Sequence, residues 1–147
     1  MAIVDRGRLY VASAGDCRAY SVRGGQAERL AVDQTLFQLF VDAGLAHDRH
    51  QAVRSRRMLW SCLGDPKFEL PRVRCEEIQA ADRLILVSNG MTRVVNDGLI
   101  GRLGTITKSA TATTASVVNA ALTLRTTDDA TCVTVSFGDV SSEAPAE

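Results

Sequence analysis

The sequence predicts an α+β fold in which antiparallel strands open the chain and helices are interspersed later. Residues 8–13 alternate apolar and polar side chains with a period of two, as half-buried strands do, and further strand-like runs follow at 17–23 and 28–32. Residues 35–44 and 109–124 instead repeat their apolar side chains at helical spacing. Since the strands are grouped at the start and do not alternate regularly with helices, a doubly wound parallel sheet is disfavoured.

The first predicted strands are residues 8–13 and 17–23, which the turn signal at 14–16 would join as a hairpin. Gly24 and Gly25 can take the positive φ of a two-residue turn, which leads to a third strand at 28–32. We therefore predict an antiparallel meander. We also expect the first strand of the chain to begin at residue 2 or 3. The chain is therefore expected to start inside its sheet, and the domain to be incomplete.

The period changes at Thr35, which fits the N-cap of a short helix that Gly44 can end. Residues 46–57 are polar and arginine-rich, and we expect a loop or a loose helix there. A turn signal follows at 64–66. Beyond it the pattern predicts two strands, one helix and a closing strand, at residues 71–78, 83–87, 109–124 and 132–137.

Length and charge limit the function classes. The chain has 147 residues, 46% of them apolar, which suits one globular domain. Its 17 basic and 17 acidic side chains cancel, so no overall field draws it to nucleic acid or to an anionic membrane. With no export signal and no apolar run near the ~20 residues of a membrane helix, we expect a cytoplasmic location. Residues 1–140 are expected to form the domain and 141–147 a flexible tail.

The histidine, arginine and cysteine patterns of the sequence indicate no strong binding or catalytic site. The histidines, His47 and His50, lie three residues apart, but no carboxylate or cysteine clearly completes a metal set, so we expect surface histidines. Arginines cluster between residues 49 and 57, and this cluster is either a solvated face or a weak phosphopeptide site formed by Arg54, Arg56 and Arg57. Four cysteines without a Cys-x-x-Cys pair are expected to be reduced core residues: Cys17, Cys62, Cys75 and Cys132.

Three separated segments carry a resemblance. Residues 9–20 read LYVASAGDCRAY, with ERLAVDQ behind them at 28–34. Residues 81–90 read ADRLILVSNG, and residues 128–135 read DDATCVTV. In order and spacing these segments resemble the metal-dependent, type 2C (PPM-type) protein serine/threonine phosphatases, most closely the bacterial ones.

The resemblance implies an α-β-β-α sandwich and the hydrolysis of phosphoserine and phosphothreonine esters. In that family two Mg²⁺ or Mn²⁺ ions between the sheets activate a water for attack on phosphorus. An N-terminal segment supplies the family's phosphate-binding arginine and its metal-bridging aspartate. This sequence has no counterpart of that segment, so we expect the fold to lack the N-terminal strands and helices. Its one Asp-Gly pair, Asp97-Gly98, fits a loop or a helix start.

Residue by residue, the resemblance places two metal-site aspartates and two departures. Asp128 matches the terminal metal ligand, and Asp16 matches an aspartate of an additional metal. Asn89 stands where the family has a metal-ligating aspartate, and Arg93 stands where many members have another. A guanidinium about 5 Å from a divalent ion opposes it by roughly 6 to 7 kcal/mol at an effective dielectric near 20. We therefore expect Mg or Mn to bind this chain weakly or not at all.

The sequence is compatible with two functions, and also with a third possibility, a folded remnant that has no role of its own. The first is a pseudophosphatase, a non-catalytic module that binds a phosphoprotein, a kinase or a regulatory protein. The alternative is the C-terminal portion of an active phosphatase whose metal-binding segment lies elsewhere, so the sequence leaves enzymatic activity undecided. In both cases an uncovered sheet edge predicts a homodimer or a partner chain.

Overall fold

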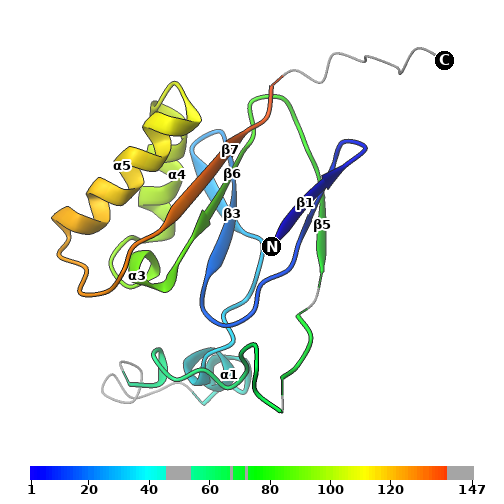
Figure 1. Cartoon of the computed structure of the whole chain (residues 1–147), viewed down its shortest axis with the longest axis vertical. Coiled ribbons are helices and arrows are strands. Elements are labelled where there is room, and N and C mark those ends of the chain that lie inside the picture. The colour runs from blue at the N-terminus through cyan, green and yellow to red at the C-terminus, as the bar shows by residue number, and fades with distance from the viewer. Residues whose placement is uncertain (46–53, 67, 72, 139–147) are drawn as a thin grey trace.

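The computed structural model describes residues 1–45, 54–66, 68–71 and 73–138. Two antiparallel sheets face each other, and two helices lie against the outer face of one of them (Figure 1). The described layers are therefore helix, sheet, sheet, in agreement with the predicted α+β class. Within this part of the chain no helix is both long and apolar enough to cross a lipid bilayer.

The smaller sheet has three strands in the order β1-β2-β5. They are β1 (Ala2–Asp5), β2 (Arg8–Val11) and β5 (Arg74–Glu77). The larger sheet has the order β4-β3-β6-β7. Its strands are β4 (Gln26–Arg29), β3 (Arg18–Arg23), β6 (Arg83–Val87) and β7 (Cys132–Ser136).

The prediction of an antiparallel meander at the start of the chain is wrong in one respect. β2 pairs with β1 and β5, whereas β3 pairs with β4 and β6, so residues 8–13 and 17–23 form no hairpin. Between them the chain crosses from one sheet to the other through Gly15, at φ +81°. Leu9 and Val11 bury their side chains against Ala19 of the opposite sheet, and this contact replaces edge pairing. The β3–β4 hairpin and its two-glycine turn are confirmed.

Four helices are described: α1 (Leu36–Asp42), α3 (Asn89–Thr92), α4 (Asp97–Ile106) and α5 (Ala110–Thr123). The predicted cap of α1 is confirmed, since the Thr35 hydroxyl accepts a hydrogen bond from the Gln38 amide. Helix α5 agrees with the predicted range of 109–124. Helix α4 was not predicted over its length, because three glycines lower its helix propensity.

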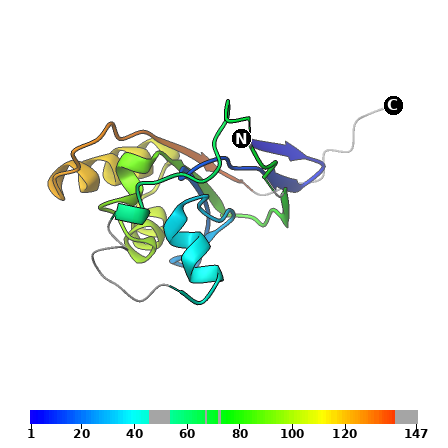
Figure 2. The same ribbon diagram turned by 90° about the horizontal axis from the view of Figure 1, so that it is seen from below.

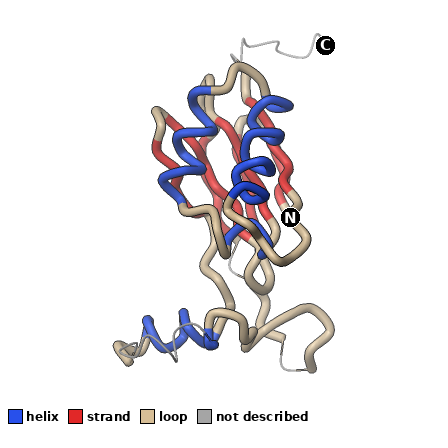
Figure 3. The backbone as a smooth tube through the Cα atoms, turned by 90° about the vertical axis from the view of Figure 1, so that its left-hand side faces the viewer, coloured by secondary structure: helices blue, strands red, loops and turns tan. Residues whose placement is uncertain are grey.

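Those glycines let α4 approach the sheet closely. A Cβ on Gly101 would lie 2.5 Å from the Gly25 carbonyl oxygen, and one on Gly104 would lie 2.9 Å from a methyl carbon of Val22. Helices α4 and α5 pack together on the four-stranded sheet (Figure 3). The larger hydrophobic cluster lies in this layer and comprises Tyr20, Val22, Ile85, Val87, Met91, Val95, Ile100, Val117 and Ala121.

The smaller cluster lies between the sheets and comprises Leu9, Val11, Ala19, Leu30 and Leu84. The cysteines lie mostly outside both clusters: all four are free, as predicted, but Cys17 and Cys75 are exposed, so the expectation that they belong to the core is wrong. Cys75 lies in β5, whereas Cys17 directly precedes β3 in the crossover between the sheets.

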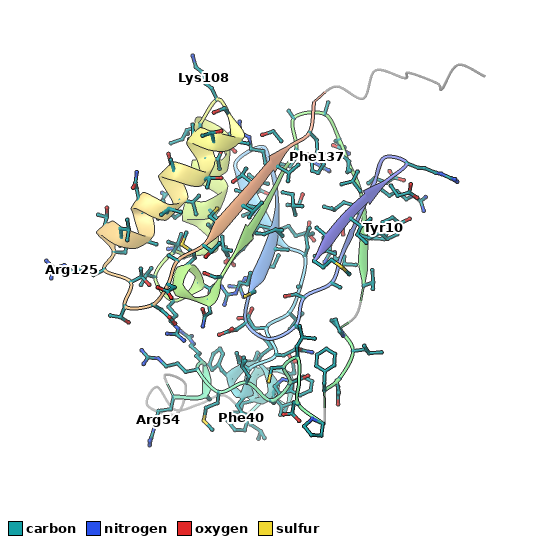
Figure 4. All side chains as sticks on the ribbon, viewed as in Figure 1. Tyr10, Phe40, Arg54, Lys108, Arg125 and Phe137 are labelled. Carbon is teal, nitrogen blue, oxygen red and sulfur yellow. The ribbon has the colours of Figure 1, made fainter. Side chains whose placement is uncertain are left out.

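The outer face of the three-stranded sheet is uncovered in the described part of the chain. Strand register places Ile3, Tyr10 and Cys75 side by side, on the face opposite Leu9 and Val11. Helices α4 and α5 lie at one side of the molecule and β1 at the other (Figure 2). Figure 4 likewise shows Tyr10 far from the Lys108 and Arg125 side chains that flank helix α5. The described residues therefore include no counterpart of the fourth, helical layer that the resemblance implies.

Candidate functional site

The second and third sequence segments meet at one end of the four-stranded sheet. The Ser88 hydroxyl donates to the Asp129 carbonyl at 3.1 Å and accepts from the Thr131 amide at 2.9 Å. Gly90 is the residue that permits this contact, because a Cβ there would lie 2.2 Å from the same Asp129 oxygen. These hydrogen bonds place α3 next to Asp128, as the resemblance predicts.

An ion pair occupies the position where the resemblance implies a metal. Arg93 follows α3 directly, and its Nη1 lies 2.7 Å from Oδ2 of Asp128. The other carboxylate oxygen, Oδ1, accepts from the Asp129 amide at 3.0 Å. Both oxygens of Asp128 are thus engaged by nitrogen donors. The side chains of Arg93 and Asp128 are 32% and 37% exposed.

Asp16 lies at the crossover between the sheets and lines, with Arg93, a cavity of about 450 Å³. The crossover is fixed by the Gly15 amide, which donates to Oε1 of Gln34 at 2.9 Å. Burial raises the pKa of the Asp16 carboxyl above its usual value, and its own backbone amide and the nearby arginines oppose this only in part. No ion pair of Asp16 occurs among the described residues.

Further carboxylates line the same cavity, and arginines neutralise them too. Arg18 binds Asp33 through two nitrogens, at 2.8 Å from Nε and 2.5 Å from Nη2. Asp97 accepts from the Tyr20 hydroxyl at 2.9 Å and from Nε of Arg29 at 2.8 Å. This network was not predicted, since its members are up to 77 residues apart in the sequence and belong to no local motif.

The residues present do not fit a two-metal centre. No group of three or more histidine, cysteine, aspartate or glutamate side chains in the described chain could hold a metal ion. Asn89, at the start of α3, contributes no charge. Asp128 faces the guanidinium of Arg93. Asp97 is the first residue of helix α4, after the N-cap Asn96, so the Asp97-Gly98 pair lies at a helix start, which was one of its two predicted settings.

The predicted arginine cluster separates into two parts. Arg56 and Arg57 line the 450 Å³ cavity, whereas Arg54 does not and extends outward near α1 (Figure 4). The guanidinium of Arg56 lies over the Phe37 ring, with Cζ 4.4 Å from the ring centroid. His47, His50 and Arg49 lie outside the described residues, as does the predicted tail at 141–147.

Comparison with known proteins shows which proteins this chain resembles in sequence and fold. The serine/threonine protein phosphatase PstP of Mycobacterium tuberculosis is 30% identical over 94 residues, which are 63% of this chain and 18% of PstP. The solved M. tuberculosis PstP/Ppp structure superposes with a TM-score of 0.81 at 26% identity, over 93% of this chain and 58% of that one. The PPM phosphatase MsPP of Mycobacterium smegmatis gives 0.74 at 26% identity, over 88% and 56%.

A phosphatase of S. agalactiae has the same fold, with a TM-score of 0.83 at 19% identity. The PstP catalytic domain has also been solved in complex with 2 manganese ions. No model of a known protein family matches the chain. The chain spans less than a fifth of PstP and little more than half of the solved phosphatase chains. Its homologues and structural neighbours are bacterial PPM-type serine/threonine phosphatases, and the chain shares the fold of that family.

Proposed function

We propose that this chain is a non-hydrolytic PPM-type domain, which binds a phosphorylated protein, a kinase or a regulatory protein without removing phosphate. The observation that supports this most directly is the ion pair between Arg93 and Asp128. In the family, metal ions supply the nucleophile by lowering the pKa of a bound water. Here the carboxylate that would bind such an ion already binds a fixed positive charge.

The ion pair by itself does little to prevent a metal ion from binding at Asp128. Both side chains are about one-third exposed, and exposed pairs of this kind contribute roughly 0 to 1 kcal/mol. The larger obstacle is that a metal which displaced Arg93 would meet the neutral amide of Asn89 instead of a second carboxylate. Hard divalent ions need several anionic or neutral oxygens at once, and the described residues hold no such set near Asp128.

The proposal is tested by incubating the chain with a phosphoserine peptide and Mn²⁺ or Mg²⁺ and measuring phosphate release. We expect no release above the metal-only background, and no change in Asp128→Ala. Manganese-dependent release that Asp128→Ala abolishes would instead support the alternative, that the chain is the C-terminal portion of an active phosphatase.

A gain of metal affinity tests the same point from the opposite direction. In Asn89→Asp/Arg93→Asp we expect measurable Mn²⁺ binding, detected as loss of the free-ion electron paramagnetic resonance signal. The matched control is Asn119→Asp/Arg102→Asp, which makes the same charge change at exposed positions of α5 and α4. Equal Mn²⁺ binding by both variants would mean that only bulk charge matters and would overturn this account of the site.

A further inference from the structure

The two described sheets have four edge strands, and one of them differs from the others in composition. Natural proteins place charged side chains on edge strands because these prevent pairing with another chain. β1 ends in Asp5, β4 ends in Glu28 and Arg29, and β5 has three charged residues out of four. β7 reads Cys-Val-Thr-Val-Ser and has no charge, proline or glycine. It is therefore the edge that is least protected against pairing with a further strand.

The outer edge of β7 offers backbone hydrogen-bonding groups at alternate residues. On its inner side, the Ser88 amide donates to the Thr131 carbonyl and the Phe137 amide donates to the Asp82 carbonyl. Hydrogen-bonded pairs recur at every second residue of an antiparallel ladder, so the odd-numbered residues of β7 bond to β6. The N–H and C=O groups of residues 132, 134 and 136 therefore point outward. β7 has no neighbour on that side among the described strands (Figure 1).

The side chains of β7 form a symmetric pattern about Thr134. On the face toward α5, the Thr114 hydroxyl donates to the Thr134 hydroxyl at 2.9 Å. On the other face, Val133 and Val135 flank Thr134 and are 50% and 38% exposed. A second copy of the strand, turned by a two-fold axis at Thr134, presents the same pattern in the opposite direction. The edge is thus complementary to itself.

We infer that two copies of this chain pair antiparallel through β7, about a two-fold axis at Thr134, and join their four-stranded sheets into one continuous sheet. Cys132 then lies opposite the partner's Ser136, and Thr134 lies opposite its own counterpart. These residues exchange on the order of six backbone hydrogen bonds, because each hydrogen-bonded pair makes two. Val133 lies opposite the partner's Val135, and such cross-strand pairs of β-branched side chains stabilise a sheet.

Other registers use the edge less well. A shift by one residue would set the outward groups of one copy against residues whose groups point back to β6, so no ladder would form. A shift by two residues would leave residue 132 or 136 without a partner inside β7. The net charge of the chain is zero, so no overall repulsion opposes the approach of a second copy. The sequence predicted a homodimer or a partner chain, and this inference commits to one edge and one register.

Sedimentation velocity over a range of concentrations tests the pairing. We expect a dimer, and Thr134→Pro is expected to weaken it at least about tenfold, since proline removes an N–H that points to the second copy. No hydrogen bond between β6 and β7 is lost, and edge strands tolerate proline at such positions.

The matched control is Val4→Pro on the edge of β1. Met1 and Ala12 exchange both backbone hydrogen bonds, so the N–H of Val4 also points outward, away from β2. This variant is expected to dimerise normally. Equal weakening by the two prolines would overturn the inference. A monomer of the unmodified chain at high concentration would also overturn it, and would leave the edge of β7 to a strand of a different protein.

Disulfide trapping tests the register, in a chain whose four free cysteines are replaced by serine. Val133→Cys and Val135→Cys, mixed and oxidised, are expected to form a cross-linked dimer, because directly opposite Cα atoms lie about 4.5 Å apart. Each variant alone is expected to cross-link several-fold less, since its two cysteines are diagonal neighbours at about 7 to 8 Å.

Equal cross-linking in the mixture and in the single variants would overturn the register. Circular dichroism checks that every variant is folded. If Thr134→Pro does not fold, the trapping experiment decides by itself, because both of its substitutions lie at exposed side chains. Absence of any cross-link would then overturn the pairing.

Discussion

The two sheets of this molecule differ in how they are covered. The four-stranded sheet packs against helices on one face and against the other sheet on its second face, and the larger cluster of buried residues lies on its helical side. The three-stranded sheet is covered on one face only, by a smaller cluster. We therefore expect most of the folding stability to come from the four-stranded sheet and its helices, whereas the three-stranded sheet leaves apolar side chains exposed.

The largest expected effect is a cavity in the helical half. Ile85→Ala removes a fully buried side chain from the larger cluster and is expected to lower the free energy of unfolding by about 2 to 5 kcal/mol. Leu9→Ala in the smaller cluster is expected to cost less, near the lower end of that range. Urea denaturation of both variants measures the difference. Equal losses would break the comparison, because the two clusters would then contribute alike.

The close approach of α4 to the sheet gives the next effect. Gly101→Ala forces a methyl group against the backbone at residue 25 and is expected to cost about 1 to 3 kcal/mol. Gly98→Ala is the control on the same helix, because its Cβ would make an ordinary contact at 3.5 Å. It is expected to be neutral or to stabilise by up to about 1 kcal/mol. A neutral Gly101→Ala in thermal denaturation would mean that α4 is not held tightly on the sheet.

A pair of charges lies at one end of the neighbouring strands β3 and β6 of the four-stranded sheet, and its effect is smaller. Arg23, at the end of β3, donates to both oxygens of Asp82 at 2.7 and 2.6 Å, and these hydrogen bonds hold the pKa of Asp82 below its usual 3.8. The stabilisation is therefore complete above that value and is lost as the pH falls through the lower pKa of the folded state. It is worth on the order of 1 kcal/mol, since Arg23 is half exposed.

Urea titrations between pH 2 and 6 should show this loss in the unmodified chain and a flatter profile in Asp82→Asn. Asp5→Asn, at the exposed end of β1, is the control and should keep the full pH dependence. An unchanged profile in Asp82→Asn would mean that the ion pair with Arg23 does not stabilise this end of the four-stranded sheet.

Substitutions in the edge strand β7 are expected to have the smallest effect on folding stability but a large effect on self-association of the chain. Thr134 contacts Thr114 of α5, so Val133 and Val135 point to the opposite face, where they are 50% and 38% exposed. We expect the chain to self-associate through this uncovered face, and Val133→Asp to yield monomers with unfolding free energy changed by less than about 0.5 kcal/mol.

Sedimentation velocity measures this association. Leu122→Asp, an exposed position on α5, is the control and should leave it unchanged. A well-soluble monomer of the unmodified chain at high concentration would contradict the expectation. The exposed valines of β7 would then need no partner to cover them.

Local pattern predicted the strands and the longest helix well, because period and caps are local properties. It failed on the pairing of β2 and β3, since a Gly-Asp turn looks the same whether the strands beside it pair or cross to another sheet. Helix α4 was missed for a related reason. Its glycines count against a helix in isolation, and only the close approach to the sheet at residues 25 and 22 explains Gly101 and Gly104.

The site was predictable in its positions but not in its contacts. The resemblance placed Asp128 and Arg93 in one region and predicted that metal binding would be weak. It did not indicate that the two side chains bind each other, since they are separated by helices α4 and α5 in the sequence. The cavity lined by Arg29 and Trp60 also depends on residues brought together only by folding.

The contact between Arg93 and Asp128 also limits how such a chain can change over generations. Replacing the arginine alone leaves one carboxylate beside a neutral amide, and replacing Asn89 by aspartate alone adds a second carboxylate that the arginine can also bind. Neither single step assembles a metal centre, so neither offers selection anything to favour. If the proposed function holds, a return of metal binding would therefore need changes at Asn89 and Arg93 together.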